Sequence, residues 1–242
     1  MTWSIIARDA TGAFGVAVAS KFFAVGALCP HARSGVGALA TQALLNPLFV
    51  APGLDAMAQG TPPADIIGHL TAADEGRDHR QLHMIDRENR SAAYTGAACI
   101  DWCGHTAGEG FSVAGNMLAG PEVIASTASF YQSHPHLDFA ERLLLALAAG
   151  EAAGGDKRGK QGAALRVYTT EDYPALDLRV DDHDEPITEL QRLYAKSLER
   201  YQPFTACLPT QARPAGLFDR SLIEAEVQRF HAARPAAHGT AA

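Results

Sequence analysis

The chain has 242 residues, of which 47% are hydrophobic and 19% charged; this is enough to bury the core of one large domain and excludes an intrinsically disordered chain. The net charge is −7 and the Lys and Arg residues are scattered, which excludes the basic stripe of a nucleic-acid-binding protein. No apolar run approaches the roughly 20 residues of a membrane-spanning helix, and no secretion-signal pattern follows Met1. We therefore expect a cytoplasmic protein that binds neither nucleic acid nor membrane.

The N-terminal region predicts a β-hairpin. Residues 3–8 (WSIIAR) and 14–20 (FGVAVAS) are short apolar, β-branched runs, and residues 9–12 between them form a typical hairpin turn. Residues 35–41 (GVGALAT) predict a third strand, and their small side chains indicate that another element packs closely against this backbone.

Further along the chain, clusters of helices alternate with clusters of strands. Apolar residues at helical spacing predict a helix pair within 53–73 and helices at 121–132, 139–149 and 187–198. Apolar runs predict strands at 81–86, 91–95, 102–107, 110–114, 163–168 and 176–180. Because a parallel βαβ sheet would alternate element by element, we expect an α+β fold: a four-layer αββα sandwich with two mainly antiparallel sheets.

We expect this sandwich to span residues 1–201. Residues 202–242 then form a C-terminal extension, with one helix at 218–231 and a disordered tail at 235–242.

The dipeptide Met1-Thr2 carries the main chemical hypothesis. Methionine aminopeptidases remove Met before small residues, which would leave a free α-amine beside the Thr2 hydroxyl at the start of a strand. The amine then acts as the base for the hydroxyl, so no His is required. Lys21, which ends the second strand of the hairpin, would lower the pKa of this amine by like-charge repulsion. The alternative for Lys21 is a solvated side chain that merely ends the strand.

Two neighbouring positions are assigned to substrate binding. Arg80 and Gln81 lie where a loop enters a strand, and a guanidinium group beside an amide could bind a substrate carboxylate. The alternative for Arg80 is an internal salt bridge to Asp78 or Asp86.

Several motifs between Thr2 and Tyr201 occur together in one family. They are TWSIIARD, GVAVASKFFAVGA, PHARSGVGALATQ, DHRQLHMID, YTGAAC, GNMLAGPEV, GGDKRGKQGAAL and DLRVDDH. Through them the chain resembles the bacterial and archaeal domain-of-unknown-function family 1028 (DUF1028). The resemblance implies a sandwich similar to that of N-terminal-nucleophile (Ntn) hydrolases. It also favours Thr2 over Ser4 as the nucleophile, because relatives with a secretion signal would begin with this Thr after cleavage.

Some relatives carry a peptidoglycan-binding module, which hints at cell-wall-derived amides, whereas this chain ends in a different, short extension. The resemblance also strengthens Asn116 as an oxyanion-hole residue, since its side-chain N–H groups or neighbouring backbone N–H groups could stabilise an oxyanion. An Asn at this position could instead serve only the turn.

Three further residues are assigned to substrate binding. Ser20 is next to Lys21 at the end of its strand, and His31 is next to Pro30 in a position compatible with a pocket. Asp156 belongs to a glycine-rich loop that we expect to cover the active site; this loop lacks the order of a phosphate-binding loop.

No metal and no cofactor are assigned. The cysteines Cys29, Cys99, Cys103 and Cys207 follow no CxxC pattern, and reduced thiols are expected. Cys103 with His105 would need two more ligands to form a zinc site. The DLRVDDH motif could bind a hard cation, or its alternating residues could form an ion-paired row on one strand face.

We therefore expect an Ntn amidohydrolase that cleaves a small or cyclic amide or a peptide-like compound through a Thr2 acyl-enzyme, and we expect a homodimer. Two alternatives stay open. One is a non-catalytic binding or assembly module on the same sandwich, and the other is a metal-dependent hydrolase that uses Asp181, Asp182 and His183.

Overall fold

The computed structural model describes residues 2–234. Met1 and the expected C-terminal tail at 235–242 lie outside the described residues. The chain divides into two compact units, Met1–Gln191 and Arg192–Ala242. The candidate site lies entirely in the first unit, so that unit is described in more detail.

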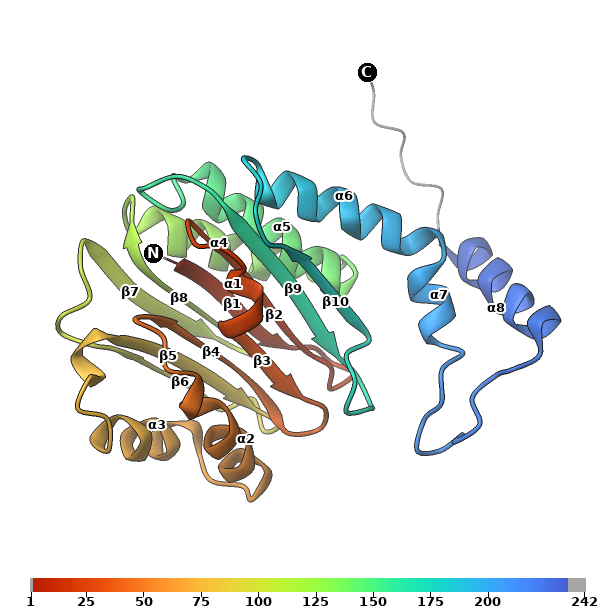
Figure 1. The fold of residues 1–242 in the computed structure, drawn as a ribbon, viewed down its shortest axis with the longest axis horizontal. Helices are drawn as coiled ribbons and strands as arrows, with labels where there is room; N and C mark the ends of the chain where they lie inside the picture. The colour runs from red at the N-terminus through yellow and green to blue at the C-terminus, as the bar shows by residue number, and fades with distance from the viewer. Residues whose placement is uncertain (1, 235–242) are drawn as a thin grey trace. The chain divides into compact units, whose positions relative to one another are not determined.

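Within the described residues, the strands of the first unit form two antiparallel sheets (Figure 1). The six-stranded sheet has the spatial order β10 (Leu176–Val180), β9 (Gly162–Tyr168), β2 (Phe14–Ser20), β1 (Thr2–Arg8), β8 (Phe111–Leu118) and β7 (Trp102–Gly108). The four-stranded sheet has the order β3 (Pro30–Arg33), β4 (Gly37–Ala43), β5 (Arg80–Asp86) and β6 (Ser91–Thr95).

Helices cover the outer face of each sheet. The helices of this unit are α1 (Val25–Leu28), α2 (Val50–Ala58), α3 (Pro63–Ala72), α4 (Glu122–Ser133), α5 (Phe139–Ala152) and the first part of α6 (Pro186–Glu199). Helices α4 and α5 pack on the six-stranded sheet and α2 and α3 on the four-stranded sheet, while β1 and β2 face β4 between the sheets (Figure 1). The four-layer αββα sandwich predicted from the sequence is therefore confirmed.

The predicted N-terminal hairpin is present, and its turn has a local cause. The Asp9 carboxylate accepts hydrogen bonds from the backbone N–H groups of Thr11 and Ala13, at 2.9 and 2.8 Å. Gly12 then adopts a φ of +91°, which a side chain would disfavour. This turn sets the register of β1 against β2, which pairs Trp3 with Ala19.

The small residues of β4 let neighbouring elements pack closely against this strand, as expected from the sequence. A Cβ on Gly37 would lie 2.6 Å from the Ile85 carbonyl oxygen and 2.8 Å from the Met57 sulfur, so the glycine allows α2 and β5 to approach this strand. The sequence missed α1 and β3, which are only four residues long each and too short to display a hydrophobic period.

The second unit contains the remainder of α6, α7 (Tyr201–Thr205) and α8 (Arg220–Ala233). Arg200 and Glu224 form an ion pair at 2.6 Å that links the segment before α7 to α8. The helix expected at 218–231 is thus present as α8. Among the described residues, no helix combines the length and apolar character that crossing a membrane requires.

Candidate active site

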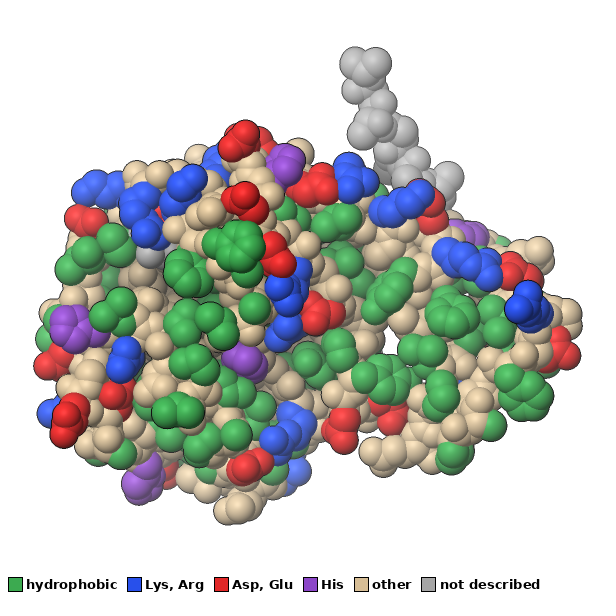
Figure 2. Space-filling model, in the orientation of Figure 1, with side chains coloured by type: hydrophobic (Ala, Val, Ile, Leu, Met, Phe, Trp, Pro, Cys, Tyr) green, Lys and Arg blue, Asp and Glu red, His purple; other side chains and the backbone are tan. Residues whose placement is uncertain are grey.

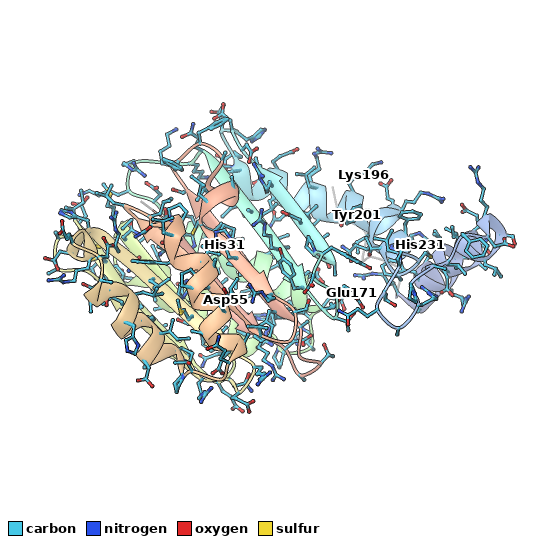
Figure 3. All side chains as sticks on the ribbon, turned by 60° about the horizontal axis from the view of Figure 1, so that its bottom comes forward. His31, Asp55, Glu171, Lys196, Tyr201 and His231 are labelled. Carbon is cyan, nitrogen blue, oxygen red and sulfur yellow. The ribbon has the colours of Figure 1, made fainter. Side chains whose placement is uncertain are left out.

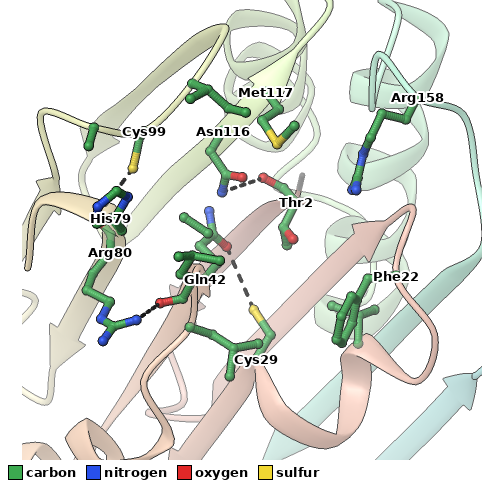
Figure 4. A pocket seen from close by; sticks show the side chains of 16 residues that line it. Thr2, Phe22, Cys29, Gln42, His79, Arg80, Cys99, Asn116, Met117 and Arg158 are labelled. Atoms are coloured by element: carbon green, nitrogen blue, oxygen red, sulfur yellow. Dashed lines mark hydrogen bonds between the residues drawn. The ribbon is translucent and has the colours of Figure 1, made fainter. Parts of the chain in front are cut away.

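Thr2 opens β1 near the middle of the six-stranded sheet and lines a cavity of this unit. Its Cα pairs with that of Asn116 on β8, and its hydroxyl lies 3.1 Å from the Ser20 hydroxyl at the end of β2. The cavity has a volume of about 740 Å³. Its lining includes Thr2, Phe22, Val25, Cys29, Gln42, Ala43, Leu44, Leu45, His79, Arg80, Ala98, Cys99, Ile100, Asn116, Met117 and Arg158 (Figure 4).

The backbone around this cavity is strained. Ala43, which ends β4, has a φ of 66°, and Met117, which follows Asn116, has a φ of 54°. Both residues line the cavity, and both adopt the left-handed conformation that costs a residue with a Cβ about 1–2 kcal/mol. Strain of this kind concentrates at functional sites, because the surrounding structure must hold it in place.

Gln81 is the centre of a buried hydrogen-bond network between the two sheets. Its side-chain Nε2 donates to the carbonyl oxygens of Gly115, at 2.8 Å, and Gly104, at 3.2 Å. Because a carbonyl oxygen can only accept, these two contacts fix which end of the Gln81 amide carries the nitrogen. The Gln81 Oε1 atom must therefore act as an acceptor.

This fixed orientation determines that of Asn116 as well. Asn116 Nδ2 donates to Gln81 Oε1 at 3.0 Å and to the Thr2 carbonyl oxygen at 3.3 Å. Both N–H groups of the Asn116 amide are thus in use, and its buried Oδ1 accepts no hydrogen bond from the described residues. The side-chain amide therefore presents an acceptor and has no N–H group left for an oxyanion. The alternative that neighbouring backbone N–H groups stabilise an oxyanion stays a prediction.

The network continues from Gln81 to a buried histidine. Gln42 Nε2 donates to Gln81 Oε1 at 2.7 Å, so Gln42 Oε1 accepts from the Ser4 hydroxyl, also at 2.7 Å. Ser4 must then accept from Nε2 of His83, at 2.9 Å. Because full burial keeps the imidazole of His83 neutral, its Nδ1 accepts from the Ser112 hydroxyl, at 3.1 Å.

Ser4 and His83 resemble a nucleophile–base pair, but both residues are 0% exposed and neither lines the cavity. Burial lowers the pKa of His83 to about 3. The pair therefore cannot reach a substrate, and its hydrogen bonds serve to fix the packing of the sheets.

Two thiols also line the cavity, and burial disfavours their reactive form. The pKa of Cys29 is raised because the residue is fully buried, and that of Cys99 is raised by burial and by the nearby Cys103. Since the thiolate is the nucleophilic form of cysteine, burial disfavours nucleophilic attack by either thiol.

The two arginines of the cavity have different environments. Arg80 donates through Nε to Asp74 at 2.8 Å and through a terminal nitrogen to the Leu44 carbonyl oxygen at 2.6 Å. Its hydrogen bond also lowers the pKa of Asp74. Arg80 therefore forms an internal salt bridge, which was the alternative to substrate binding, but its partner is Asp74 instead of Asp78 or Asp86. Arg158, which the sequence analysis did not select, extends into the cavity from the glycine-rich loop (Figure 4).

Lys21 and Asp156 meet through the Lys21 backbone. The Lys21 N–H donates to the Asp156 carboxylate at 2.7 Å, whereas the Lys21 ammonium group donates to the carbonyl oxygen of Lys160 at 2.9 Å. Lys21 does not line the cavity of Thr2, because its long side chain follows the glycine-rich loop. Asp156 and Ser20 line a second, smaller cavity of about 360 Å³.

The other predicted positions lie outside the main cavity. His31 is on β3, the edge strand of the four-stranded sheet (Figure 3), and its Nε2 lies 3.0 Å from the Leu28 carbonyl oxygen. Gln81 is fully buried behind Asn116.

In the DLRVDDH motif, Asp181 pairs with Arg179 at 2.8 Å and Asp182 accepts from Gln161 at 3.1 Å. Within residues 2–234 there is no group of three or more His, Cys, Asp or Glu side chains suited to hold a metal ion.

The fold and the cavity define a four-layer αββα protein that presents a buried threonine hydroxyl from the start of a central strand. The chain belongs to DUF1028, a family of unknown function, which matches residues 2–190. A DUF1028 protein of known crystal structure from Silicibacter pomeroyi is 32% identical, with a TM-score of 0.83 over 90% of this chain and 99% of that one.

Anbu (ancestral beta-subunit) from Yersinia bercovieri has 11% identity and a TM-score of 0.36 over 81% of this chain and 94% of that one. No curated protein matches the chain. The family expected from the sequence motifs is thus confirmed.

Proposed function

We propose that the protein is an amidohydrolase whose nucleophile is the hydroxyl of Thr2, freed as the N-terminal residue by removal of Met1. The observation that carries the proposal is the position of Thr2: its hydroxyl is held 3.1 Å from the Ser20 hydroxyl, and the residue lines a cavity of about 740 Å³. A cavity of this size suits a small-molecule substrate.

The chemistry needs only groups of the chain and one water. The free α-amine of Thr2 removes the proton from Oγ1, and Oγ1 attacks the carbonyl carbon of the amide. The tetrahedral intermediate collapses, the C–N bond breaks, and the leaving amine takes the proton from the Thr2 ammonium group. Water then attacks the ester with the α-amine again as base, which releases the carboxylic acid and restores Thr2.

Asn116 and Ser20 support Thr2 in this scheme. Asn116 Nδ2 holds the Thr2 carbonyl group, and the acceptor-only Oδ1 of the same amide suits a hydrogen bond from the Thr2 α-amine, which keeps its lone pair directed at Oγ1. An α-amine has a pKa of about 7.7–8.0, so a substantial fraction is free base near neutral pH without help from Lys21. The hydrogen bond between the Ser20 and Thr2 hydroxyls orients Oγ1.

The test is turnover of a panel of small amides by the native chain, Thr2→Ala and Thr2→Ser. We expect Thr2→Ala to abolish turnover and Thr2→Ser to retain part of it, since Ser keeps the hydroxyl and is also a substrate for Met removal. Circular dichroism and thermal unfolding should show the same fold in all three proteins. Equal turnover by Thr2→Ala would refute the proposal.

Lys21→Gln is a matched control at the residue that directly follows β2. The Lys21 ammonium group donates to the backbone carbonyl oxygen of Lys160 and therefore does not contact Thr2. We expect turnover by this variant within about twofold of the native rate, because a remote surface charge has only a small effect. If Met1 remains on the purified chain and no amide is cleaved, a binding role for the same cavity is the better account.

A further inference from the structure

The charges around the cavity have one sign. Among the described lining residues there is no Asp or Glu, whereas Arg80 and Arg158 are present. A cavity with this lining favours an anionic ligand, and a carboxylate is the anion that a planar guanidinium group binds best through two parallel hydrogen bonds.

Of the two arginines, Arg158 is the better anchor for such an anion. Both arginines pair with an Asp, but Arg80 contacts Asp74 at 2.8 Å, also donates to the Leu44 carbonyl oxygen, and has a side chain that is only 21% exposed. Arg158 lies 3.3 Å from Asp156 through one terminal nitrogen, and its side chain is 41% exposed. A guanidinium group has five N–H donors, so Arg158 can contact Asp156 and bind the carboxylate of a ligand at the same time.

The loop that carries Arg158 is fixed in place by Asp156. The Asp156 carboxylate is buried and accepts hydrogen bonds from the backbone N–H groups of Lys21, at 2.7 Å, and Arg158, at 2.8 Å. It thereby ties the glycine-rich loop to the end of β2, where Ser20 contacts Thr2. The distance between Arg158 and the nucleophile is thus set by the fold.

The rest of the cavity wall is apolar, and part of it is exposed to solvent. Phe22, Leu44 and Ile100 line the cavity and are 46%, 62% and 58% exposed. On the face shown in Figure 2, hydrophobic side chains gather over the first unit, and Lys and Arg side chains lie along its upper edge. Covering such apolar surface with an apolar ligand group would stabilise the complex by about 25 cal/mol per Å².

The two arginines of the cavity lie on different sides of the nucleophile. In Figure 4, Thr2 lies between Arg158 on one side and His79, Arg80 and Cys99 on the other. Leu44 and Ile100 belong to segments beside Arg80, since the Arg80 guanidinium group donates to the Leu44 carbonyl oxygen and the Cys99 thiol lies 3.5 Å from the Arg80 carbonyl oxygen. Asp74 and Leu44 already engage the Arg80 guanidinium group, so this side offers mainly apolar side chains to a ligand. A substrate that spans Thr2 would therefore direct its anionic end to Arg158 and its apolar end to these segments.

We propose that the substrates are N-acyl amino acids, in which an apolar acyl group occupies the side of Leu44 and Ile100 and the carboxylate of the amino acid binds Arg158. This rests on the proposed function of Thr2. The acyl carbon is transferred to Thr2 Oγ1, the amino acid leaves with the proton from the Thr2 ammonium group, and water releases the acyl group as a carboxylic acid.

Calorimetric titration tests the binding part separately from turnover. The full-length chain with Thr2→Ala is titrated with N-hexanoylglycine and with N-hexanoylglycinamide, which differs only in lacking the negative charge. We expect the acid to bind at least about tenfold more tightly, the effect of one charge-assisted contact. Adding Arg158→Gln should reduce this ratio to about one, while Arg158→Lys should retain part of it.

Lys157→Gln is the matched control, since Lys157 is on the same loop but pairs with Asp101 and does not line the cavity of Thr2; the ratio should stay at its original value. Equal binding of the two compounds, no binding of either, or a ratio that survives Arg158→Gln would each overturn the proposal. Turnover of N-hexanoylglycine by the chain with Thr2 intact is measured separately. Arg158-dependent binding without turnover would preserve the carboxylate site and refute the amidohydrolase.

Discussion

Replacing Gln81 with Met should destabilise the protein far more than the loss of one side chain suggests. Met matches the length of Gln but cannot accept from Gln42 Nε2 or Asn116 Nδ2, which donate to Gln81 Oε1 at 2.7 and 3.0 Å. Gln42 and Asn116, which carry these donors, are each only 1% exposed. A buried N–H group without an acceptor costs about 1–3 kcal/mol, so two such groups give an expected loss of about 4 kcal/mol.

The assay is urea denaturation at pH 7, followed by circular dichroism, with Thr95→Val as the control. Thr95 also contacts Gln81, at 2.9 Å, but it is half-buried and its variant leaves Gln81 Oε1 in place, so we expect a loss of about 1 kcal/mol. A loss below about 1 kcal/mol for Gln81→Met, or equal losses in the two variants, would refute the view that Gln81 orients Asn116 and Gln42.

Three further predictions follow from the same contacts. Burial lowers the pKa of His83 from 6.5 to about 3. Between pH 6.5 and pH 3, His83 therefore takes up a proton in the unfolded chain but not in the folded protein. Its contribution to the free energy of unfolding should fall by about 1.4 kcal/mol for each pH unit below 6.5. Denaturation at pH 7 and pH 5 should therefore show a smaller loss for His83→Gln than for the native chain, and equal losses would contradict the neutral, buried imidazole. Ser20→Ala should slow acylation of Thr2 about fivefold with the fold intact, since one hydrogen bond of about 1 kcal/mol is lost; an unchanged rate in stopped-flow acylation would exclude its orienting role. Ala43→Gly should raise the free energy of unfolding by up to about 1 kcal/mol because it relieves a left-handed φ, whereas Ala40→Gly in the same strand should lower it by at least about 0.5–1 kcal/mol; losses of the same size would show that Ala43 carries no strain.

Most of the fold could be predicted from the sequence because its long elements have clear periods. The strand at 176–180 and the helix starting at 139 were placed where β10 and α5 lie. The short elements α1 and β3 could not be found this way. They are defined by their contacts with distant strands, and these contacts leave no periodic pattern in four residues.

The candidate site was predictable only in part. The pairing of Thr2 with Asn116, 114 residues away, follows from strand order, which a single sequence does not reveal. Arg80 and Arg158 are equally basic in the sequence, and in the structure both line the cavity and pair with an Asp. Only the structure shows that Arg80 is the less exposed of the two and also donates to the Leu44 carbonyl oxygen. A glycine-rich loop next to a buried Asp is the signal that could have pointed to Arg158.

The most direct test of the Thr2 nucleophile is the intact mass of the purified native chain before and after reaction with a β-lactone, an electrophile that acylates N-terminal threonine. The account predicts a mass without Met1, one adduct per chain, location of that adduct on Thr2 by peptide sequencing, and no adduct in Thr2→Ala. Retention of Met1, or an adduct on Cys29 or Cys99 with Thr2 unmodified, would contradict it.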